Sequence, residues 1–420
     1  MMEKANNWQS TADRILARVV AVQMQADEGA PVRDLVSTDE ANRVLHHSLL
    51  AIMRHRAVLD WCIDRVAARD VRPRLRRVLR WGLCQLLYME SLPPAVAVDT
   101  CVRFVKRRHD VREAGFVNAV MRRLADAGRE RLLADVAREA PPHVRLELGE
   151  ALYRRWAARF PGDELERLAH LCLVPAPVIV RLRRGAPMPQ LECLTPVVPP
   201  PWAQEEMLWS CLDAAAFFRS PEHARSDFYI QDPATLLAPR LLAVRPGERV
   251  GDLCAAPGGK ALALAEALGS VSGLFCLDRS LHRIRLVLEN FAPSGGCHAV
   301  VGDAAMPPFP PRSFDAVLLD VPCSNTGVLR RRPDVRWRFS SLALAELVAL
   351  QGGILRGTAD LVRPGGRLVY STCSIEPEEN GAQVRRFLAE RGDYLLDRDE
   401  EVLPGPDHDG AYAALLRRQG

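Results

Sequence analysis

Apolar side chains recur every three to four residues through roughly the first 140 residues, which is the spacing of amphipathic helices. In "LRRVLRWGLCQLLYM", arginines separate the apolar positions, which are Leu75, Val78, Leu79, Leu83, Leu86 and Leu87. Pro93-Pro94 would end this helix and open a second one, expected from Ala95 to about Arg108. A third helix is expected through 116–124. The pattern therefore predicts an all-helical module over 1–140.

The pattern changes near residue 231, where short apolar runs alternate with helical stretches. The runs lie at 248–254, 273–278, 298–303, 314–320 and 366–372. Nearly continuous apolar strands separated by helices predict a parallel sheet that is covered on both faces. We therefore expect an α/β domain over 231–420.

The segment 141–230 between these two parts is less regular. It contains two expected helices broken at Pro161-Gly162, a strand in "PAPVIVRLRRG", and a turn or linker in "LTPVVPPPW" at 194–202. We interpret 141–230 as a small connecting subdomain, which gives the chain three parts.

Composition then narrows the class of protein. The 420 residues are 48% hydrophobic and 26% charged, as in soluble globular proteins. No apolar run approaches the roughly 18 residues of a membrane span, and the first residues lack the order of a secretory signal. Eleven cysteines without a CxxC pair argue against a disulfide framework and a zinc site. We therefore expect a cytoplasmic protein with reduced thiols, no metal and no membrane contact.

The charge of the chain is unevenly distributed. Residues 71–131 hold fourteen Lys and Arg against six Asp and Glu, and "LRRRPDVRWR" (329–338) places five arginines around Asp334 and Trp337. Such clusters are often only solvated faces. Because cations neutralise phosphates and aromatic rings stack on bases, they also favour RNA or DNA as a partner.

The segment "GDLCAAPGGKALALAEAL" reads as a strand, a turn of small residues and a helix. A P-loop would need glycine where Cys254 stands and Ser or Thr where Ala261 stands, and the GxGxxG fingerprint is absent. The remaining ligand class is a nucleoside without a polyphosphate. Asp278, which follows Gly258 by 20 residues, would hold its ribose hydroxyls. S-adenosylmethionine fits this description; a structural turn without a ligand is the alternative.

Three of the predicted strands end on an acid, at Asp278, Asp303 and Asp320. Ligands of open α/β sheets bind outside the carboxyl ends of the strands. The loops after the fourth and fifth strands leave the sheet at this edge too, so Cys323 and Cys373 can converge there. The alternative is that both are buried core thiols.

A methyltransferase needs a thiol nucleophile when the atom that accepts the methyl group is carbon 5 of a pyrimidine. Carbon 5 is a poor nucleophile, but a thiolate that adds to carbon 6 creates an enamine whose carbon 5 attacks a sulfonium methyl. An acid such as Asp320 could stabilise N3, and a base must remove the carbon-5 proton. Lys260, one of only three lysines in an arginine-rich chain, would position and support the reacting groups.

Several segments resemble a known family. "GFVNAVMRRL" (115–124), after a "VDTCVRFVKRR" helix, resembles the NusB antitermination family. "DLCAAPGGK", "DVPCSNTGVLRRRPD" and "YSTCSIEPEEN" resemble the signature motifs of RNA 5-methylcytosine methyltransferases, and "FYIQDPAT" (228–235) resembles the segment before their core. Over nearly its full length the chain resembles the bacterial RsmB (Sun/Fmu) family, which methylates a cytosine of 16S rRNA. "DGAYAALLRR" (409–418) departs from the family, which usually has a bulkier aromatic pair there.

The resemblance implies a Rossmann-like S-adenosylmethionine-dependent methyltransferase domain, preceded by an all-α NusB-like RNA-binding domain and the connecting subdomain. It implies Cys373 as nucleophile and Cys323 in product release. The cofactor contacts that it implies are Cys254, Ala255, Ala256, Pro257, Gly258, Gly259, Lys260, Asp278, Asp303 and Asp320. We expect a monomer whose partner is RNA, most of all 16S rRNA.

Two other functions stay open. One is a tRNA cytosine-C5 methyltransferase; the other is a non-catalytic RNA-binding factor in assembly or antitermination. DNA cytosine methyltransferases lack a second cysteine in a TCS motif, so the presence of both cysteines favours the RNA class. We expect the acidic stretch Glu376 to Glu379 to begin the next helix and assign it no chemistry.

Overall fold

The structure is a computed structural model that describes residues 2–35, 43–89 and 92–420. The chain forms two compact units. The first comprises residues 1–174 and 332–340, and the second comprises 175–331 and 341–420. The division into 1–140, 141–230 and 231–420 stays a prediction; the two units divide the chain between Val174 and Pro175.

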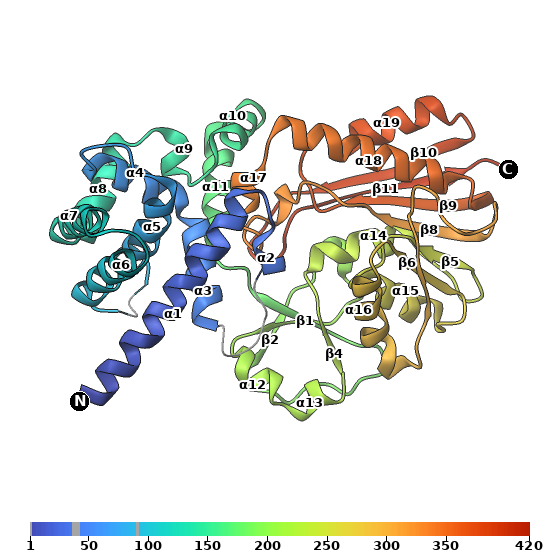
Figure 1. The fold of residues 1–420 in the computed structure, drawn as a ribbon. Helices are drawn as coiled ribbons and strands as arrows, with labels where there is room; N and C mark the ends of the chain where they lie inside the picture. The colour runs from blue at the N-terminus through green and yellow to red at the C-terminus, as the bar shows by residue number, and fades with distance from the viewer. Residues whose placement is uncertain (1, 36–42, 90–91) are drawn as a thin grey trace. The chain divides into compact units, whose positions relative to one another are not determined.

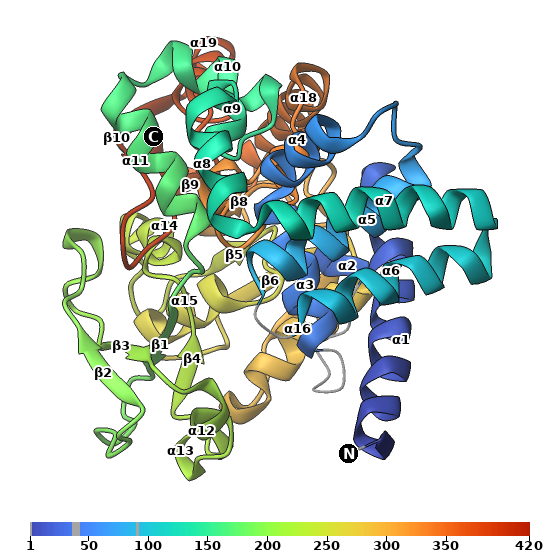
Figure 2. The same cartoon turned by 90° about the vertical axis from the view of Figure 1, so that its left-hand side faces the viewer.

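The first unit is helical, in the described part of the chain, as the apolar spacing predicts (Figures 1 and 2). Its helices are α1 (Met2–Asp27), α2 (Val32–Leu35), α3 (Arg43–Arg54), α4 (Arg56–Val66), α5 (Pro73–Leu87), α6 (Pro94–Arg108), α7 (Val111–Ala127), α8 (Arg129–Glu139), α9 (Pro142–Arg145), α10 (Glu150–Arg159), α11 (Gly162–Leu173) and α17 (Val335–Arg338). Helices α5, α6 and α7 match the three helices expected from the sequence. They pack on one another around a shared core (Figure 2).

Ion pairs neutralise part of the basic segment 71–131. Arg72 and Arg74 both contact Glu113, at 2.9 and 2.7 Å. Asp27, Asp60 and Asp13, which lie outside the segment, pair with further arginines of α5 and α6. The side chains of Lys106, Arg112 and Arg122 are exposed and remain available to phosphate groups.

Two of the five arginines in the second basic cluster, Arg330 and Arg336, are buried. Arg336 lies in the first unit and donates to the backbone oxygens of Arg54 and Cys172, and Trp337 donates to that of Met53. Arg330 is buried in the second unit. Arg336 and Arg330 therefore satisfy carbonyl oxygens and are not available to RNA. Arg331 is exposed, and Arg332 and Arg338 are half-buried, so RNA binding by this cluster stays a prediction.

The second unit begins with a small antiparallel sheet of order β2-β3-β1-β4. Its strands are β1 (Val178–Leu182), β2 (Leu194–Val197), β3 (Leu208–Cys211) and β4 (Phe228–Ile230), followed or interrupted by η2 (Pro201–Ala203), α12 (Ala214–Phe218) and α13 (Pro221–Ala224). The prediction of a turn over 194–202 is wrong for its first four residues, because Leu194–Val197 form strand β2. Pro196 is tolerated there because β2 is an edge strand.

The main sheet has seven strands in the order β10-β11-β9-β8-β5-β6-β7. They are β5 (Val250–Asp252), β6 (Leu274–Asp278), β7 (His298–Val301), β8 (Phe314–Asp320), β9 (Val362–Thr372), β10 (Tyr394–Val402) and β11 (Ala411–Arg418). Strands β5 to β9 pair in parallel, and β11 joins β9 and β10 antiparallel. This is the Rossmann-like α/β arrangement expected from the sequence.

Alternating side chains of the sheet pack into two different cores. On β9, Val369 belongs to one core, and its neighbours Leu368 and Tyr370 belong to the other. Helices α18 and α19 cover one face, and α14, α15 and α16 cover the other (Figure 1). The covering helices are η3 (Pro233–Leu236), α14 (Leu237–Leu242), α15 (Gly259–Leu268), α16 (Leu281–Phe291), η4 (Ala292–Ser294), η5 (Thr326–Val328), α18 (Ser341–Ala359) and α19 (Gly381–Glu390). The central strands are therefore buried on both faces, which explains their nearly continuous apolar sequences, whereas the edge strands β7 and β10 are more exposed.

Within the described residues, no helix combines the length and the apolar character that crossing a membrane requires.

Two glycines of α18 offer a matched test of this packing. A Cβ on Gly357 would lie 2.1 Å from the backbone oxygen of Ala305, whereas a Cβ on Gly353 would meet no atom within 4 Å. We expect Gly357→Ala to lower the free energy of unfolding by about 1–3 kcal/mol. Gly353→Ala should raise it by about 0.5–1 kcal/mol. Urea denaturation of both variants checks this; equal effects would contradict the packing of α18 on the loop at Ala305.

Candidate functional site

The order of the parallel strands places a site at the carboxyl ends of β5 and β8. The chain runs outward from β5 to β6 and β7, then returns to β8 on the other side of β5. This reversal is the switch point at which open α/β sheets bind ligands. Both strands end on an aspartate there, Asp252 and Asp320.

The turn after β5 needs its glycines. Gly258 has a φ of +111°, a left-handed conformation that strains other residues. A Cβ on Gly259 would lie 2.8 Å from the ring of Tyr229. Helix α15 begins at Gly259, so its first free N–H groups face the turn. The predicted segment 254–260 is therefore shaped for close approach of a ligand to the backbone.

Two of the predicted acids follow the next strands. Asp278 is the last residue of β6; it accepts a hydrogen bond from the Ser280 N–H at 3.1 Å and lies 3.4 Å from the Arg283 guanidinium. Asp303 lies just beyond β7 and accepts from the Ala305 N–H at 2.8 Å. Both acids thus stand at the same sheet edge as the turn, held by local backbone donors.

Asp252 opens the "DLCAAPGGK" motif but was not among the site residues expected from the sequence. It is 1% exposed, and neither carboxylate oxygen has a hydrogen-bond partner of good geometry among the described residues. Burial raises the pKa of Asp252 to about 7, and the nearby Asp320 carboxylate adds to the effect, while Lys260 opposes it. An orphaned buried carboxylate beside the turn is suited to a positively charged ligand group.

Lys260 and Asp320 form the ion pair at the centre of the site. Lys260 Nζ donates to Asp320 Oδ2 at 2.6 Å, and the Ser371 hydroxyl donates to the other oxygen at 2.9 Å. Burial opposes the charge on Lys260, but the Asp320 carboxylate outweighs it and raises the pKa of the ammonium, helped by Cys373. A charged ammonium therefore faces both Asp320 and Cys373.

The two predicted cysteines lie together. Cys323 Sγ and Cys373 Sγ are 3.2 Å apart, and the Cys373 thiol donates to Asn325 Oδ1 at 3.3 Å. The hydrogen bond with Cys373 and burial raise the pKa of the Cys323 thiol well above its ordinary value, and the Glu379 carboxylate adds to this. Cys323 is 8% exposed, whereas Cys373 is only half-buried, so Cys373 is the more accessible sulfur.

A pocket opens beside Cys373. Lys260, Asp320 and Cys373 form part of its wall, with Asp232 and Asp409 opposite them. Arg331 joins these two acids, at 2.8 and 2.6 Å. Asp232 lies in the "FYIQDPAT" segment, which the sequence marked only by resemblance. The pocket thus borders both the Cys373 thiol and the Lys260–Asp320 pair.

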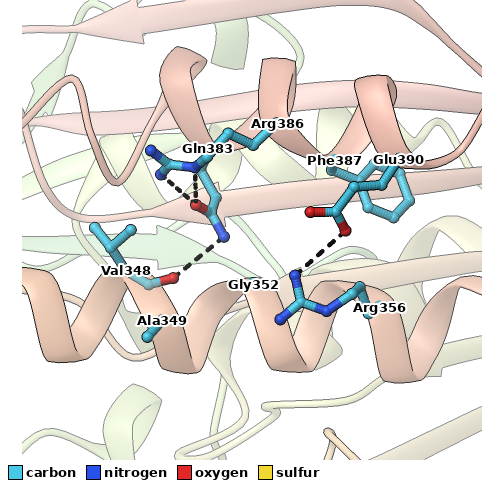
Figure 3. A pocket seen from close by; sticks show the side chains of 8 residues that line it. All are labelled: Val348, Ala349, Gly352, Arg356, Gln383, Arg386, Phe387 and Glu390. Atoms are coloured by element: carbon cyan, nitrogen blue, oxygen red, sulfur yellow. Dashed lines mark hydrogen bonds and ion pairs between the residues drawn. The ribbon is translucent and has the colours of Figure 1, made fainter.

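A second pocket lies between α18 and α19 (Figure 3). Its side chains satisfy one another: Arg356 pairs with Glu390 at 3.4 Å, and Arg386 donates to Gln383. None of the predicted site residues lines it. It is a packing groove between two helices.

Comparison with known proteins identifies the family of the chain. Residues 239–409 match the family described as "16S rRNA methyltransferase RsmB/F", and residues 7–126 match the NusB family. The ribosomal RNA small subunit methyltransferase B of Xanthomonas campestris is 31% identical over 90% of this chain and 90% of that protein. The enzyme of the same name from Vibrio cholerae is 32% identical over 80% of each chain.

The chain belongs to the RsmB/F family of rRNA methyltransferases. Like its relatives it is an RNA methyltransferase dependent on S-adenosylmethionine. The crystal structure of the protein PH0851 covers 97% of this chain and 99% of its own, with a TM-score of 0.76 at 22% identity, and so shares the fold.

The residues of this RsmB/F methyltransferase fit its cofactor. S-adenosylmethionine carries a ribose, an adenine and a charged amino group but no phosphate. The orphaned Asp252 carboxylate is chemically suited to an ammonium group, and Asp278, at the end of β6, to the hydroxyls of a ribose. The turn 254–260 lets the ligand approach the backbone.

The raised pKa of Asp252 predicts how the stability of the protein depends on pH. This pKa is about 7 in the folded protein and about 3.8 when exposed, so ionising it costs stability as the pH rises from about 4 through about 7. Asp252→Asn removes this cost. The melting temperature of the cofactor-free variant should exceed that of the wild type at pH 8, and the difference should shrink toward pH 4.

Asp303→Asn is the matched control, because Asp303 already has a backbone donor. A variant Asp252→Asn that is less stable than the wild type at pH 8 would contradict this account of Asp252.

Proposed function

We propose that this enzyme methylates carbon 5 of a cytosine in 16S rRNA through a covalent bond between Cys373 and carbon 6. The observation that supports this most is the pair of thiols 3.2 Å apart, next to the Lys260–Asp320 ion pair. Methylation of a nitrogen or a hydroxyl oxygen has no use for a thiol nucleophile, whereas carbon 5 of a pyrimidine requires one.

The cofactor supplies an electrophilic methyl group when bound. We assign its binding to the segment from Cys254 to Lys260 and to Asp278, Asp303 and Asp320, as the family resemblance implies, and add Asp252. The glycine turn would let the cofactor approach the backbone closely. Asp278 would accept hydrogen bonds from the ribose hydroxyls, and Asp252 would pair with the amino group. Asp320, which lines the pocket beside Cys373, would contact the cofactor from its place at the end of β8.

Cys373 is assigned the attack. It is half-buried, lines the pocket and faces the Lys260 ammonium, and a nearby cation favours the thiolate form of a cysteine. As sulfur bonds to carbon 6, negative charge develops toward N3 of the ring. We place the Lys260–Asp320 pair on that side, where it compensates the charge.

Cys323 is assigned the release. Its raised pKa keeps it a neutral thiol, unsuited to attack but able to exchange a proton with Cys373 at 3.2 Å. After methyl transfer, a water molecule acting as base takes the carbon-5 proton, the electron pair of that C–H bond forms the carbon 5–carbon 6 double bond, and the Cys373 sulfur leaves carbon 6 with the electron pair of the C–S bond as a thiolate. A proton donor next to this sulfur favours its departure.

The relatives' names favour small-subunit rRNA over tRNA as the substrate. The exposed cations of the first unit suit an RNA backbone. We also propose that the enzyme acts as a monomer, that it works in the cytoplasm and that it needs no metal.

Cys373→Ala should abolish methyl transfer, by more than about 10³-fold, because no covalent adduct can form. The same variant should form no denaturation-resistant complex with RNA that contains 5-fluorocytosine. Filter assays with a labelled methyl donor and denaturing gels measure the two outcomes. Cys193→Ala, which alters a half-buried cysteine outside the pocket, is the control. An adduct retained in Cys373→Ala would remove Cys373 as the nucleophile.

Cys323→Ala should instead accumulate a covalent protein–RNA complex with ordinary cytosine, since attack proceeds and release is slowed. Denaturing gels after incubation with rRNA and S-adenosylmethionine detect the complex. If none accumulates and turnover is normal, Cys323 has no part in release.

A further inference from the structure

A buried carboxylate lies beneath the two catalytic loops. Glu379 is 0% exposed and was expected to begin a helix; that expectation is wrong, because α19 begins at Gly381. Its carboxylate instead accepts hydrogen bonds from a segment 55 positions earlier in the chain. Burying a carboxylate is costly unless its lone pairs are satisfied.

Three donors satisfy Glu379. The Ser324 N–H donates to Oε1 at 2.8 Å, the Ser324 hydroxyl donates to Oε2 at 2.5 Å, and Gln351 Nε2 donates to Oε1 at 2.8 Å. Gln351, on α18, also donates to the Pro322 oxygen at 3.0 Å. Donors to a charged acceptor form strong, well-directed hydrogen bonds. Together they fix the backbone on both sides of Cys323.

The same network reaches the Cys373 loop. The Ser324 hydroxyl lies 3.0 Å from that of Ser374, and Ser374 lies 3.1 Å from Thr326 Oγ1. Direct pairing of the two strands ends just before the cysteines: Asp320 pairs with Ser371. Beyond that point, the side-chain network substitutes for the sheet ladder.

We infer that Glu379 is a positioning residue that holds Cys323 in place against Cys373 for product release. The peptide N–H that it binds belongs to the residue directly after Cys323. Cys373, by contrast, follows β9 directly, and its backbone oxygen accepts from Gly327 at 3.0 Å. Loss of the Glu379 carboxylate therefore displaces Cys323 more than Cys373.

This inference rests on the proposed function, so the experiment separates the two steps. Glu379→Gln keeps the shape of the side chain but replaces an acceptor oxygen by an amino group that opposes the donors of Ser324 and Gln351. With full-length enzyme, rRNA and S-adenosylmethionine, we expect the first turnover to stay within about threefold of the wild type. Steady-state kcat should fall at least about tenfold, with the KM for S-adenosylmethionine unchanged, and a covalent protein–RNA complex should accumulate.

Glu378→Gln, in the neighbouring half-buried residue, is the matched control and should behave as the wild type. Ser324→Ala removes one of the three donors and should give the same pattern more weakly, which keeps the test decisive if Glu379→Gln folds poorly. Normal turnover without complex in both variants would overturn the inference. So would a fall of first turnover and melting temperature without complex, because that result marks a merely structural role.

Failure of the proposed function gives a different pattern. If Cys323→Ala itself traps no complex, the release role of Cys323 fails whatever Glu379→Gln does. If Cys323→Ala traps the complex and Glu379→Gln does not, only the role of Glu379 fails.

Discussion

The parallel pairing of β8 with β9 is the constraint on which the site depends. Its register places Asp320 opposite Ser371, so the two strands end at the same level. The loops that follow then bring Cys323 and Cys373, 50 residues apart in sequence, to 3.2 Å between their sulfurs. A shift of one residue would turn every side chain of a strand to the opposite face and separate the reacting groups.

The charges of the site lie at a sheet edge that is only partly shielded from water, since the Asp320 side chain is 32% exposed. Lys260 neutralises Asp320 and faces Cys373, while Asp252 has no cation of its own at hydrogen-bond distance. A site with one satisfied and one unsatisfied acid accommodates a cationic cofactor next to a thiol nucleophile. The free-energy cost of burying these charges is offset by the apolar side chains that the covering helices bury against both faces of the sheet.

The sequence was informative where local pattern decides structure. Apolar spacing located α5, α6 and α7 and the five parallel strands, and motif spacing placed Asp278, Asp320, Cys323 and Cys373 at one sheet edge, because topology alone brings strand ends together. The proline-containing strand β2 was missed because short edge strands carry a weak pattern.

Residues whose role depends on distant partners could not be predicted. Arg336 looked like an RNA ligand, yet buried carbonyl oxygens of Arg54 and Cys172 hold it. Glu379 looked like a helix start, yet its partners come from Ser324 and Gln351. Asp252 is the first residue of the "DLCAAPGGK" motif, but its burial without a hydrogen-bond partner became visible only in the structure. Such contacts arise from tertiary packing, which sequence periodicity does not encode.

The central claim is that a carbon-5 hydrogen is exchanged for a methyl group. It is tested most directly by giving the enzyme small-subunit rRNA that carries tritium at carbon 5 of cytosine, and measuring tritium release and methyl incorporation together. Attack at carbon 6 followed by loss of the carbon-5 proton predicts one tritium released for each methyl group transferred. Methyl incorporation with the tritium retained would place the methyl group on another atom and contradict the account.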